Sequence, residues 1–244
     1  MVRASRGGLK RGVQSAAMSI LYLMRHGQAS FGTPDYDRLS TLGIRQVEML
    51  RDHLRELEDP PHAIYSGSLK RQLHTARILA GGPDDAITTL PAFDEYQAGS
   101  LIRAHAAQTG APMPEPGDGK PIDPRGFQRR LETVGSLWAE GALHAPGVET
   151  WDGFSGRVAA GLRDLMAREG RSRRVYVSTS AGVIGAAVGA LLGLAPREAI
   201  KLSWSVHNSS ITRIQYDGAR ASLLSFNAAP HLERPDRRSM LTFR

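Results

Sequence analysis

The chain of 244 residues contains no cysteine, and aromatic residues make up only 6% of it. Without cysteine, the chain forms no disulfide, holds no zinc ion or iron–sulfur cluster through thiolates, and has no thiol nucleophile. It also lacks an early apolar run, because the first one, Ser19–Met24, is shorter than the roughly 7–15 residues of a secretory signal. Disulfide scaffolds, thiolate metal sites and cysteine enzymes are therefore excluded, and we expect a cytoplasmic protein.

One long uncharged stretch, residues 175–196, approaches the length of a membrane span. Polar residues Ser178–Ser180 interrupt it and leave only Ala181–Ala195 as an apolar run rich in small residues. The pattern favours a strand, a polar turn and a buried helix, and we expect no membrane partner. Glycines spaced four residues apart predict a smooth helix face that packs against a sheet; they are Gly185, Gly189 and Gly193.

Charge of one sign is in excess, but it is concentrated at the ends of the chain. The 31 Lys and Arg residues outnumber the 24 Asp and Glu residues, which gives a net charge of +7. Residues 1–17 hold four of the basic residues and no acid, and residues 231–244 hold four more against two acids. Because the remaining body is nearly neutral and carries no zinc-finger or RNA-recognition pattern, we expect no nucleic-acid partner.

Apolar runs alternate with amphipathic patterns along the chain. Strands are predicted at 20–24, 63–65, 87–90, 175–177, 210–216 and 221–226, the last two joined by an Asp217–Gly218 turn. Helices are predicted at 42–57, at 69–80 with Ser68 as its cap and Gly81–Pro83 as its stop, and at 127–140, 154–166 and 181–195. This alternation predicts an α/β fold of three layers (α/β/α) around a mainly parallel, doubly wound sheet.

The same patterns divide the chain into one domain with two flanking tails. We predict a basic tail at 1–17, either disordered or an extended start that precedes Met18, a single domain at 18–232, and a C-terminal tail at 233–244. Residues 110–126 are dense in proline and glycine, which indicates a loop or lid. They belong to a cap inserted at about 100–150.

Polar groups follow the predicted strands, where open α/β sheets bind their ligands. They are Arg25 and His26, the segment Ser66–Arg71, Glu95, and the segment Ser178–Ser180. Two guanidinium groups match the oxygens of a phosphate, a histidine can act as nucleophile or base, and a carboxylic acid can protonate a leaving alkoxide. The combination indicates phosphomonoester chemistry without a metal or another cofactor.

Several motifs resemble those of the histidine phosphatase superfamily, which has the phosphoglycerate mutase-like fold. Leu21–Gln28, containing Arg25-His26-Gly27, is similar to the family's signature, and the similarity extends over residues 19–232. The other matching segments are Leu39–Gln46, Ile64–Arg71 with Thr75–Ala76, Glu95–Gly99, Gly147–Thr150, Asn208–Thr212 and Asn227–Leu232.

The resemblance implies a role for each matching residue. His26 would attack phosphorus and become a phosphohistidine, while Arg25 and Arg71 hold the phosphoryl oxygens. Glu95 would protonate the leaving group and then help to activate water. Gln28 and residue 180 would also contact the phosphate. The partner would be a small phosphorylated substrate or a phosphoprotein.

The sequence departs from the family pattern at three positions. Ser180 stands where the family has a second histidine, Gly32 replaces a usual asparagine, and Ala29 replaces a common threonine. These changes leave three functions open: a phosphatase with weakened catalysis, a pseudo-phosphatase that binds a phosphorylated ligand without turnover, and, ranked lowest, a mutase. Basic residues of the insertion are candidate substrate contacts: Arg103, Lys120, Arg125, Arg129 and Arg130.

Overall fold

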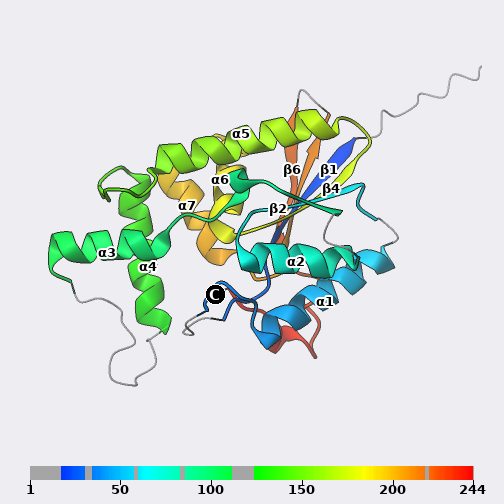
Figure 1. Cartoon of the computed structure of the whole chain (residues 1–244), viewed down its shortest axis with the longest axis horizontal. Coiled ribbons are helices and arrows are strands. Elements are labelled where there is room, and N and C mark those ends of the chain that lie inside the picture. The colour runs from blue at the N-terminus through cyan, green and yellow to red at the C-terminus, as the bar shows by residue number, and fades with distance from the viewer. Residues whose placement is uncertain are drawn as a thin grey trace, which may run out of the picture.

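The computed structural model of the chain describes residues 18–30, 35–57, 60–82, 86–111, 124–217 and 220–243. Within these ranges, six strands form one sheet with helices on both faces (Figure 1). The predicted tail at 1–17, Gly32 and most of the segment 110–126 lie outside the described residues, as do Pro83, Lys120 and Gly218.

The sheet is mainly parallel, as the sequence predicts. Its order is β3-β2-β4-β1-β5-β6, in which β1, β2, β3 and β4 pair in parallel and the β5–β6 hairpin adds two antiparallel pairings. The carboxyl ends of the parallel strands therefore meet at one edge. The strands are β1 (Ser19–Arg25), β2 (Ala63–Ser66), β3 (Ile87–Thr89), β4 (Arg174–Thr179), β5 (Ile211–Tyr216) and β6 (Ala221–Ala228).

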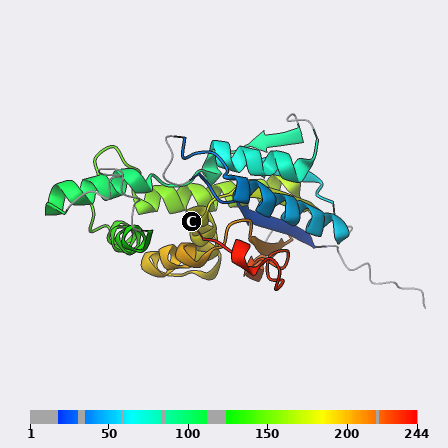
Figure 2. The ribbon, with the colours of Figure 1, turned by 90° about the horizontal axis from the view of Figure 1, so that it is seen from below.

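Alternating side chains of β1 separate the two faces of the sheet. Tyr22 and Met24 pack into one cluster with apolar side chains of α1 and α2, whereas Leu21 and Leu23 join the larger core that α5 and α6 complete. This alternation produces the three layers visible in Figures 1 and 2. The helices are α1 (Thr41–Glu56), α2 (Lys70–Ala80), α3 (Ala98–Thr109), α4 (Pro124–Ala139), α5 (Trp151–Glu169), α6 (Ala181–Leu192) and α7 (Pro196–Ser205).

The inserted cap is helical on both sides of the undescribed segment. Helices α3 and α4 extend beyond the sheet, and α4 also packs against α7 (Figure 1). The sequence patterns did not predict α3, and α4 begins at Pro124, three residues before the predicted start. Proline suits the first position of a helix because that position needs no N–H donor. None of the described helices is both long and apolar enough to cross a bilayer.

The prediction that Ser68 caps α2 is wrong. The N-cap is Leu69, whose backbone N–H donates to the side-chain oxygen of Gln72 (3.2 Å). Ser68 instead directs its hydroxyl and its backbone N–H to the carboxylate of Asp94. Ser68 therefore bonds to Asp94, a carboxylate 26 residues along the chain, and does not cap the helix. A local sequence pattern does not reveal such a distant partner.

The glycine face of α6 packs on a helix and not on the sheet, contrary to the prediction. A Cβ on Gly185 would lie 2.7 Å from the carbonyl oxygen of Ala199 in α7, and one on Gly189 would collide with the Ala199 side chain. Gly193 ends α6 in the left-handed region, with φ of 65°. The small-residue face thus fixes the position of α7, whose last turn reaches the cavity described below.

The C-terminal segment 233–244, predicted to be a tail, packs on the domain as far as it is described. Met240 is buried, and its carbonyl oxygen accepts a hydrogen bond from Gln46 in α1 (2.7 Å). The backbone N–H of Asn208 donates to the carbonyl oxygen of Thr242 (2.7 Å). These contacts bring Phe243 to the cavity at the carboxyl edge of the sheet.

Candidate active site

Four of the residues predicted from sequence meet in one cavity of about 210 Å³. Arg25 ends β1 and His26 follows it, Arg71 lies in the first turn of α2, and Glu95 precedes α3. The carboxyl edge of the parallel strands brings them together, as expected for ligand sites of open α/β sheets.

Hydrogen bonds to both ring nitrogens of His26 fix its tautomer, with Nε2 unprotonated. Its Nδ1 lies 2.7 Å from the carbonyl oxygen of Gly27, and its Nε2 accepts a hydrogen bond from Nε of Arg71 (3.1 Å). Because an arginine only donates, Nε2 carries the lone pair and Nδ1 carries the proton. The side chain is only 4% exposed. Burial, Arg71 and Arg25 together hold the pKa of His26 well below its ordinary value, so the ring is neutral.

The backbone around His26 is fixed by close contacts and buried hydrogen bonds. A Cβ on Gly27 would collide with the carbonyl oxygen of Gly43 in α1, so only glycine permits this approach. The Gly27 N–H donates to the hydroxyl of Thr75 (3.3 Å), and the Asn208 side chain donates to the carbonyl oxygen of His26 (3.2 Å). These contacts orient the imidazole without using its Nε2.

Both arginines supply positive charge to the cavity, but Arg71 forms an ion pair within the protein, whereas one nitrogen of Arg25 lacks a hydrogen-bond partner among the described residues. Arg71 forms an ion pair with Asp37 (2.6 Å) and packs its guanidinium 5.6 Å from the Tyr36 ring centre. Arg25 donates from one terminal nitrogen to the carbonyl oxygen of Val206, and its buried Nε has no partner among the described residues. Burial lowers the pKa of Arg25 to about 10, which leaves it charged near neutrality. A buried donor without a partner is suited to an incoming anion.

The carboxylate of Glu95 lies at the start of α6. One oxygen accepts the N–H of Gly182 (2.9 Å) and the other accepts the N–H of Tyr96 (3.1 Å). Burial raises the pKa of Glu95, while these two hydrogen bonds and the arginines oppose the rise. A Cβ on Gly182 would overlap a Glu95 oxygen, so glycine at this position is a condition of the arrangement.

Two predicted phosphate contacts point elsewhere. The Ser180 hydroxyl is fully buried and accepts a hydrogen bond from Nε2 of Gln72 (2.9 Å). The Gln28 side chain accepts a hydrogen bond from Ser40 (2.9 Å), the N-cap of α1. Neither residue lines the described cavity. Gln72, one residue after Arg71, therefore occupies the polar space beside Ser180.

Sequence reasoning missed several residues of the site. Asp37, the partner of Arg71, lies in a loop without a distinguishing pattern, and Gln128, Trp204 and Phe243 line the cavity from α4, α7 and the C-terminal segment. Only the helix predicted at 127–140 gave a signal, because it corresponds to α4, which carries Gln128.

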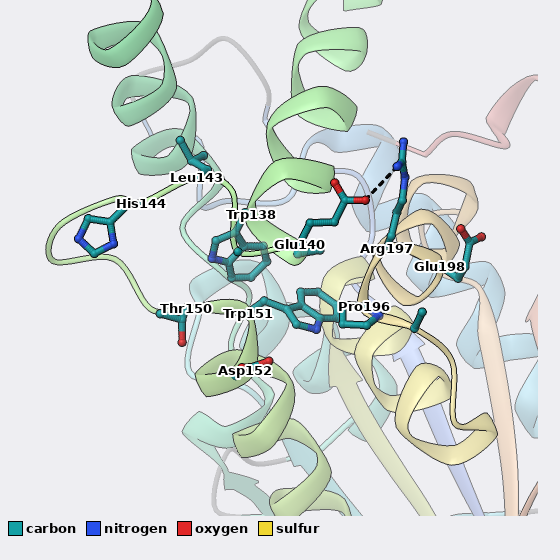
Figure 3. Close-up of a pocket in the computed structure, with 13 residues that line it drawn as sticks. Trp138, Glu140, Leu143, His144, Thr150, Trp151, Asp152, Pro196, Arg197 and Glu198 are labelled. Atoms are coloured by element: carbon teal, nitrogen blue, oxygen red, sulfur yellow. Dashed lines mark hydrogen bonds and ion pairs between the residues drawn. The ribbon is translucent and has the colours of Figure 1, made fainter.

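A larger cavity of about 740 Å³ lies between the end of α4 and the starts of α5 and α7 (Figure 3). Trp138 and Trp151 line it, and Arg197 pairs across it with Glu140 (2.9 Å). None of the predicted catalytic or phosphate-binding residues lines this cavity. Among the described residues, no group of three or more His, Asp and Glu side chains is placed to hold a metal ion.

The profile of the histidine phosphatase superfamily (branch 1) matches residues 21–119 and 123–229 of the chain. The chain belongs to the histidine phosphatase superfamily. The match includes every residue placed in the cavity above except Phe243, which follows its end. Among curated protein sequences, no significant match to this superfamily member is found.

Solved structures with similar folds include several phosphatases and a mutase. A mutant of Entamoeba histolytica phosphoserine phosphatase, solved with phosphoserine, is 20% identical with a TM-score of 0.64, covering 88% of this chain and 100% of that chain. Phosphoglycerate mutase from Bacillus anthracis is 19% identical with a TM-score of 0.60, covering 88% and 96%. Mycobacterial glucosyl-3-phosphoglycerate phosphatase is 21% identical with a TM-score of 0.60, covering 86% and 99%. At these identities, the likeness establishes the phosphoglycerate mutase-like fold.

Proposed function

We propose that the protein is a phosphomonoesterase that acts through a phosphohistidine on His26. The observation that carries this proposal is the neutral His26 ring, whose Nε2 lone pair lies 3.1 Å from Arg71 inside a cavity that also holds Arg25. Membership of the histidine phosphatase superfamily and the phosphatases among the similar folds support it.

The reaction proceeds in two transfers. Arg71 releases its hydrogen bond to Nε2 of His26 and turns to the phosphoryl oxygens, which frees the Nε2 lone pair. Nε2 then attacks phosphorus while the bond from phosphorus to the ester oxygen breaks, and protonated Glu95 gives its proton to the departing alcohol oxygen. Water then attacks phosphorus while the bond from phosphorus to Nε2 breaks, Glu95 accepts a proton from that water, and inorganic phosphate leaves the neutral His26 ring. Arg25 and Arg71 hold the oxygens of the phosphoryl group throughout, and such charge neutralisation is the main part of catalysis in phosphoryl transfer.

Radiolabelling tests the covalent intermediate. Wild-type protein mixed with a labelled phosphate ester and quenched in base should carry label, and His26→Ala should carry none. His74→Ala is the matched control, since His74 lies on α2 but does not line the cavity. A phosphoenzyme that forms equally in His26→Ala would overturn the proposal.

A second candidate is binding of a phosphorylated ligand without turnover. The hydrogen bond from Gln72 to Ser180 favours it, since a neutral hydroxyl stands where the family's second histidine is expected, and it brings no charge. Titration calorimetry with a phosphate ester would then give binding that depends on Arg71, together with no release of phosphate. Hydrolysis of an aryl phosphate that is lost in His26→Ala would exclude this candidate.

A further inference from the structure

The charged groups of the catalytic cavity gather around His26. Arg71 lies against His26, and both arginines act on the Glu95 carboxyl. The cap, α7 and the C-terminal segment provide walls that, among the described lining residues, carry no charge. These walls include Gln128, Leu131, Trp204 and Phe243, and the rings of Tyr36 and Tyr96 line the cavity beside them.

Two polar side chains on these walls are engaged within the protein, and the buried indole N–H of Trp204, which has no partner among the described residues, lies beside Gly135 of α4. The Gln128 side chain donates to Glu132 in the next turn of α4 (2.8 Å), and the Ser203 hydroxyl donates to the carbonyl oxygen of Ile200 (2.6 Å). Tyr96 stacks on Trp138 with ring centres 4.8 Å apart. The part of the cavity facing the alcohol of a substrate is therefore mainly aliphatic and aromatic.

Arginines of the cap do not change this picture where they are described. Arg103 donates to the hydroxyl of Ser100 (2.9 Å) in an exposed position, and Arg129 lies on the exposed face of α4. Neither these two nor Arg130 lines the cavity. Their expected role as substrate contacts is thus not supported, and the helix supplies Gln128 and Leu131 instead. Lys120 and the side chain of Arg125 lie outside the described part.

A substrate phosphate would take both arginines of the cavity. A carboxylate or second phosphate on the alcohol would then meet the Glu95 carboxyl and uncharged walls, and burying an anion without a partner is costly. An apolar alcohol would gain contact with Leu131, Trp204 and Phe243. We propose that this cavity selects phosphate monoesters of uncharged, largely apolar alcohols over esters whose alcohol bears an anionic group. This inference rests on the proposed function.

A pair of esters with nearly the same shape tests the selection. Isopentyl phosphate and the phosphate monoester of β-hydroxypropanoate have primary alcohols and similar length, but only the second carries a carboxylate. Because both are alkyl esters, leaving-group chemistry contributes little to the comparison. We expect kcat/KM for isopentyl phosphate to be higher by at least about tenfold. Equal values, or a preference for the carboxylated ester, would overturn the inference.

A charge placed on the apolar wall should reverse the preference. Leu131→Arg adds a guanidinium that can pair with a carboxylate, so the selectivity ratio should move toward the carboxylated ester by about tenfold, mostly through KM. Thr133→Arg adds the same charge on the exposed side of α4 and is the matched control. Gln128→Arg, on the same wall, provides the test if Leu131→Arg does not fold. An unchanged ratio in both folded wall variants would contradict the proposal.

Binding separates failure of the selection from failure of the catalytic proposal. If wild-type protein releases no phosphate from either ester, the proposed function fails, and calorimetric titration of the same two esters still decides the selection. Binding of isopentyl phosphate about tenfold tighter supports the inference. Equal or tighter binding of the carboxylated ester refutes it, whether or not turnover occurs.

Discussion

Glu95 is a residue whose protonation should set the upper pH limit of activity. Burial raises its pKa above the ordinary value of 4.5, and as a general acid it must carry its proton when the ester bond breaks. We therefore expect kcat/KM for an alkyl phosphate to fall as the pH rises through the raised pKa of Glu95. Steady-state kinetics between mildly acidic and neutral pH measures this fall.

Glu95→Gln tests whether Glu95 is the general acid, because glutamine keeps the shape of the side chain and has no carboxyl proton to donate. For an alkyl ester, the variant should lose about 10²–10⁴ in kcat/KM. The loss should be much smaller for a nitrophenyl ester, whose leaving oxygen needs little protonation. Equal losses on both esters would mean that Glu95 has another role.

The role of Ser180, the N-cap of α6, is best judged against Ser178, a second buried serine that lies in β4. Its hydroxyl accepts from Gln72 and can still donate its own hydrogen, whereas the Ser178 hydroxyl donates to the carbonyl oxygen of Gln72 (2.8 Å). If Ser180 donates to the phosphoryl group, Ser180→Ala should lower kcat by about tenfold or more, because a hydrogen bond to an ion is worth about 1.5–3 kcal/mol.

Ser178→Ala is the matched control for that comparison. It removes a hydroxyl of equal burial that is committed to the backbone, so it should reduce the free energy of unfolding with little change in kcat. Similar kinetics of the two variants would indicate that the Ser180 hydroxyl has only a structural role beside Gln72.

At the scale of elements, the contact of α6 with α7 controls one wall of the cavity. Gly189→Ala would press a methyl group into Ala199 of α7, and we expect a loss of about 1–3 kcal/mol in the free energy of unfolding. Because α7 carries Trp204, KM should rise as well. Urea denaturation and steady-state kinetics measure the two effects.

Gly156→Ala, in α5, should change the free energy of unfolding in the opposite direction to Gly189→Ala. Gly156 is exposed in α5, and no atom lies within 4 Å of a Cβ built there. Alanine should therefore stabilise the protein by about 0.4–1 kcal/mol by reducing the entropy of the unfolded chain. Loss of stability in Gly156→Ala, or none in Gly189→Ala, would contradict this reading of the two helices.

The elements also show how far sequence patterns reach. Periodicity predicts the parallel strands because their alternation of buried residues is local, as in Leu21–Met24. It did not predict that the glycines of α6 face α7. A helix that packs closely on a sheet and one that packs closely on another helix show the same spacing of small residues. The cap that Ser68 would provide is lost to Asp94, a residue far along the chain.

The four charged and titratable residues of the cavity were predictable from sequence because each lies at or after the end of a strand, at one edge of the sheet. Their partners were not. Asp37 reaches Arg71 from a loop, and Phe243 reaches the cavity through the pairing of Asn208 with Thr242 and of Gln46 with Met240. Such contacts depend on long-range chain geometry, which residue type and spacing do not encode.

At the scale of the whole molecule, two buried neutral histidines should limit stability in acid. The pKa of His26 is held well below its ordinary value, and burial with His53 and Arg237 nearby lowers the pKa of His231 to about 3 from 6.5. Below pH 6.5 the unfolded chain binds a proton at His231 that the folded protein does not bind, so acid favours unfolding. The free energy of unfolding is therefore unaffected by His231 above pH 6.5 and decreases as the pH falls toward 3.

His231→Gln isolates one of these contributions, because glutamine does not titrate and can still reach the Ser209 hydroxyl that now lies 2.8 Å from Nε2. One pKa unit corresponds to about 1.4 kcal/mol, so protonation of the unfolded chain at about pH 5 should cost the wild type about 2 kcal/mol through His231. Urea unfolding measures the free energy of unfolding at pH 7.5 and at pH 5. Its decrease between the two pH values should be about 2 kcal/mol smaller in His231→Gln than in the wild type. The variant retains the acid sensitivity that His26 contributes, so its stability still declines. Equal losses in the two proteins would mean that His231 accepts a proton in the folded state as readily as in the unfolded chain.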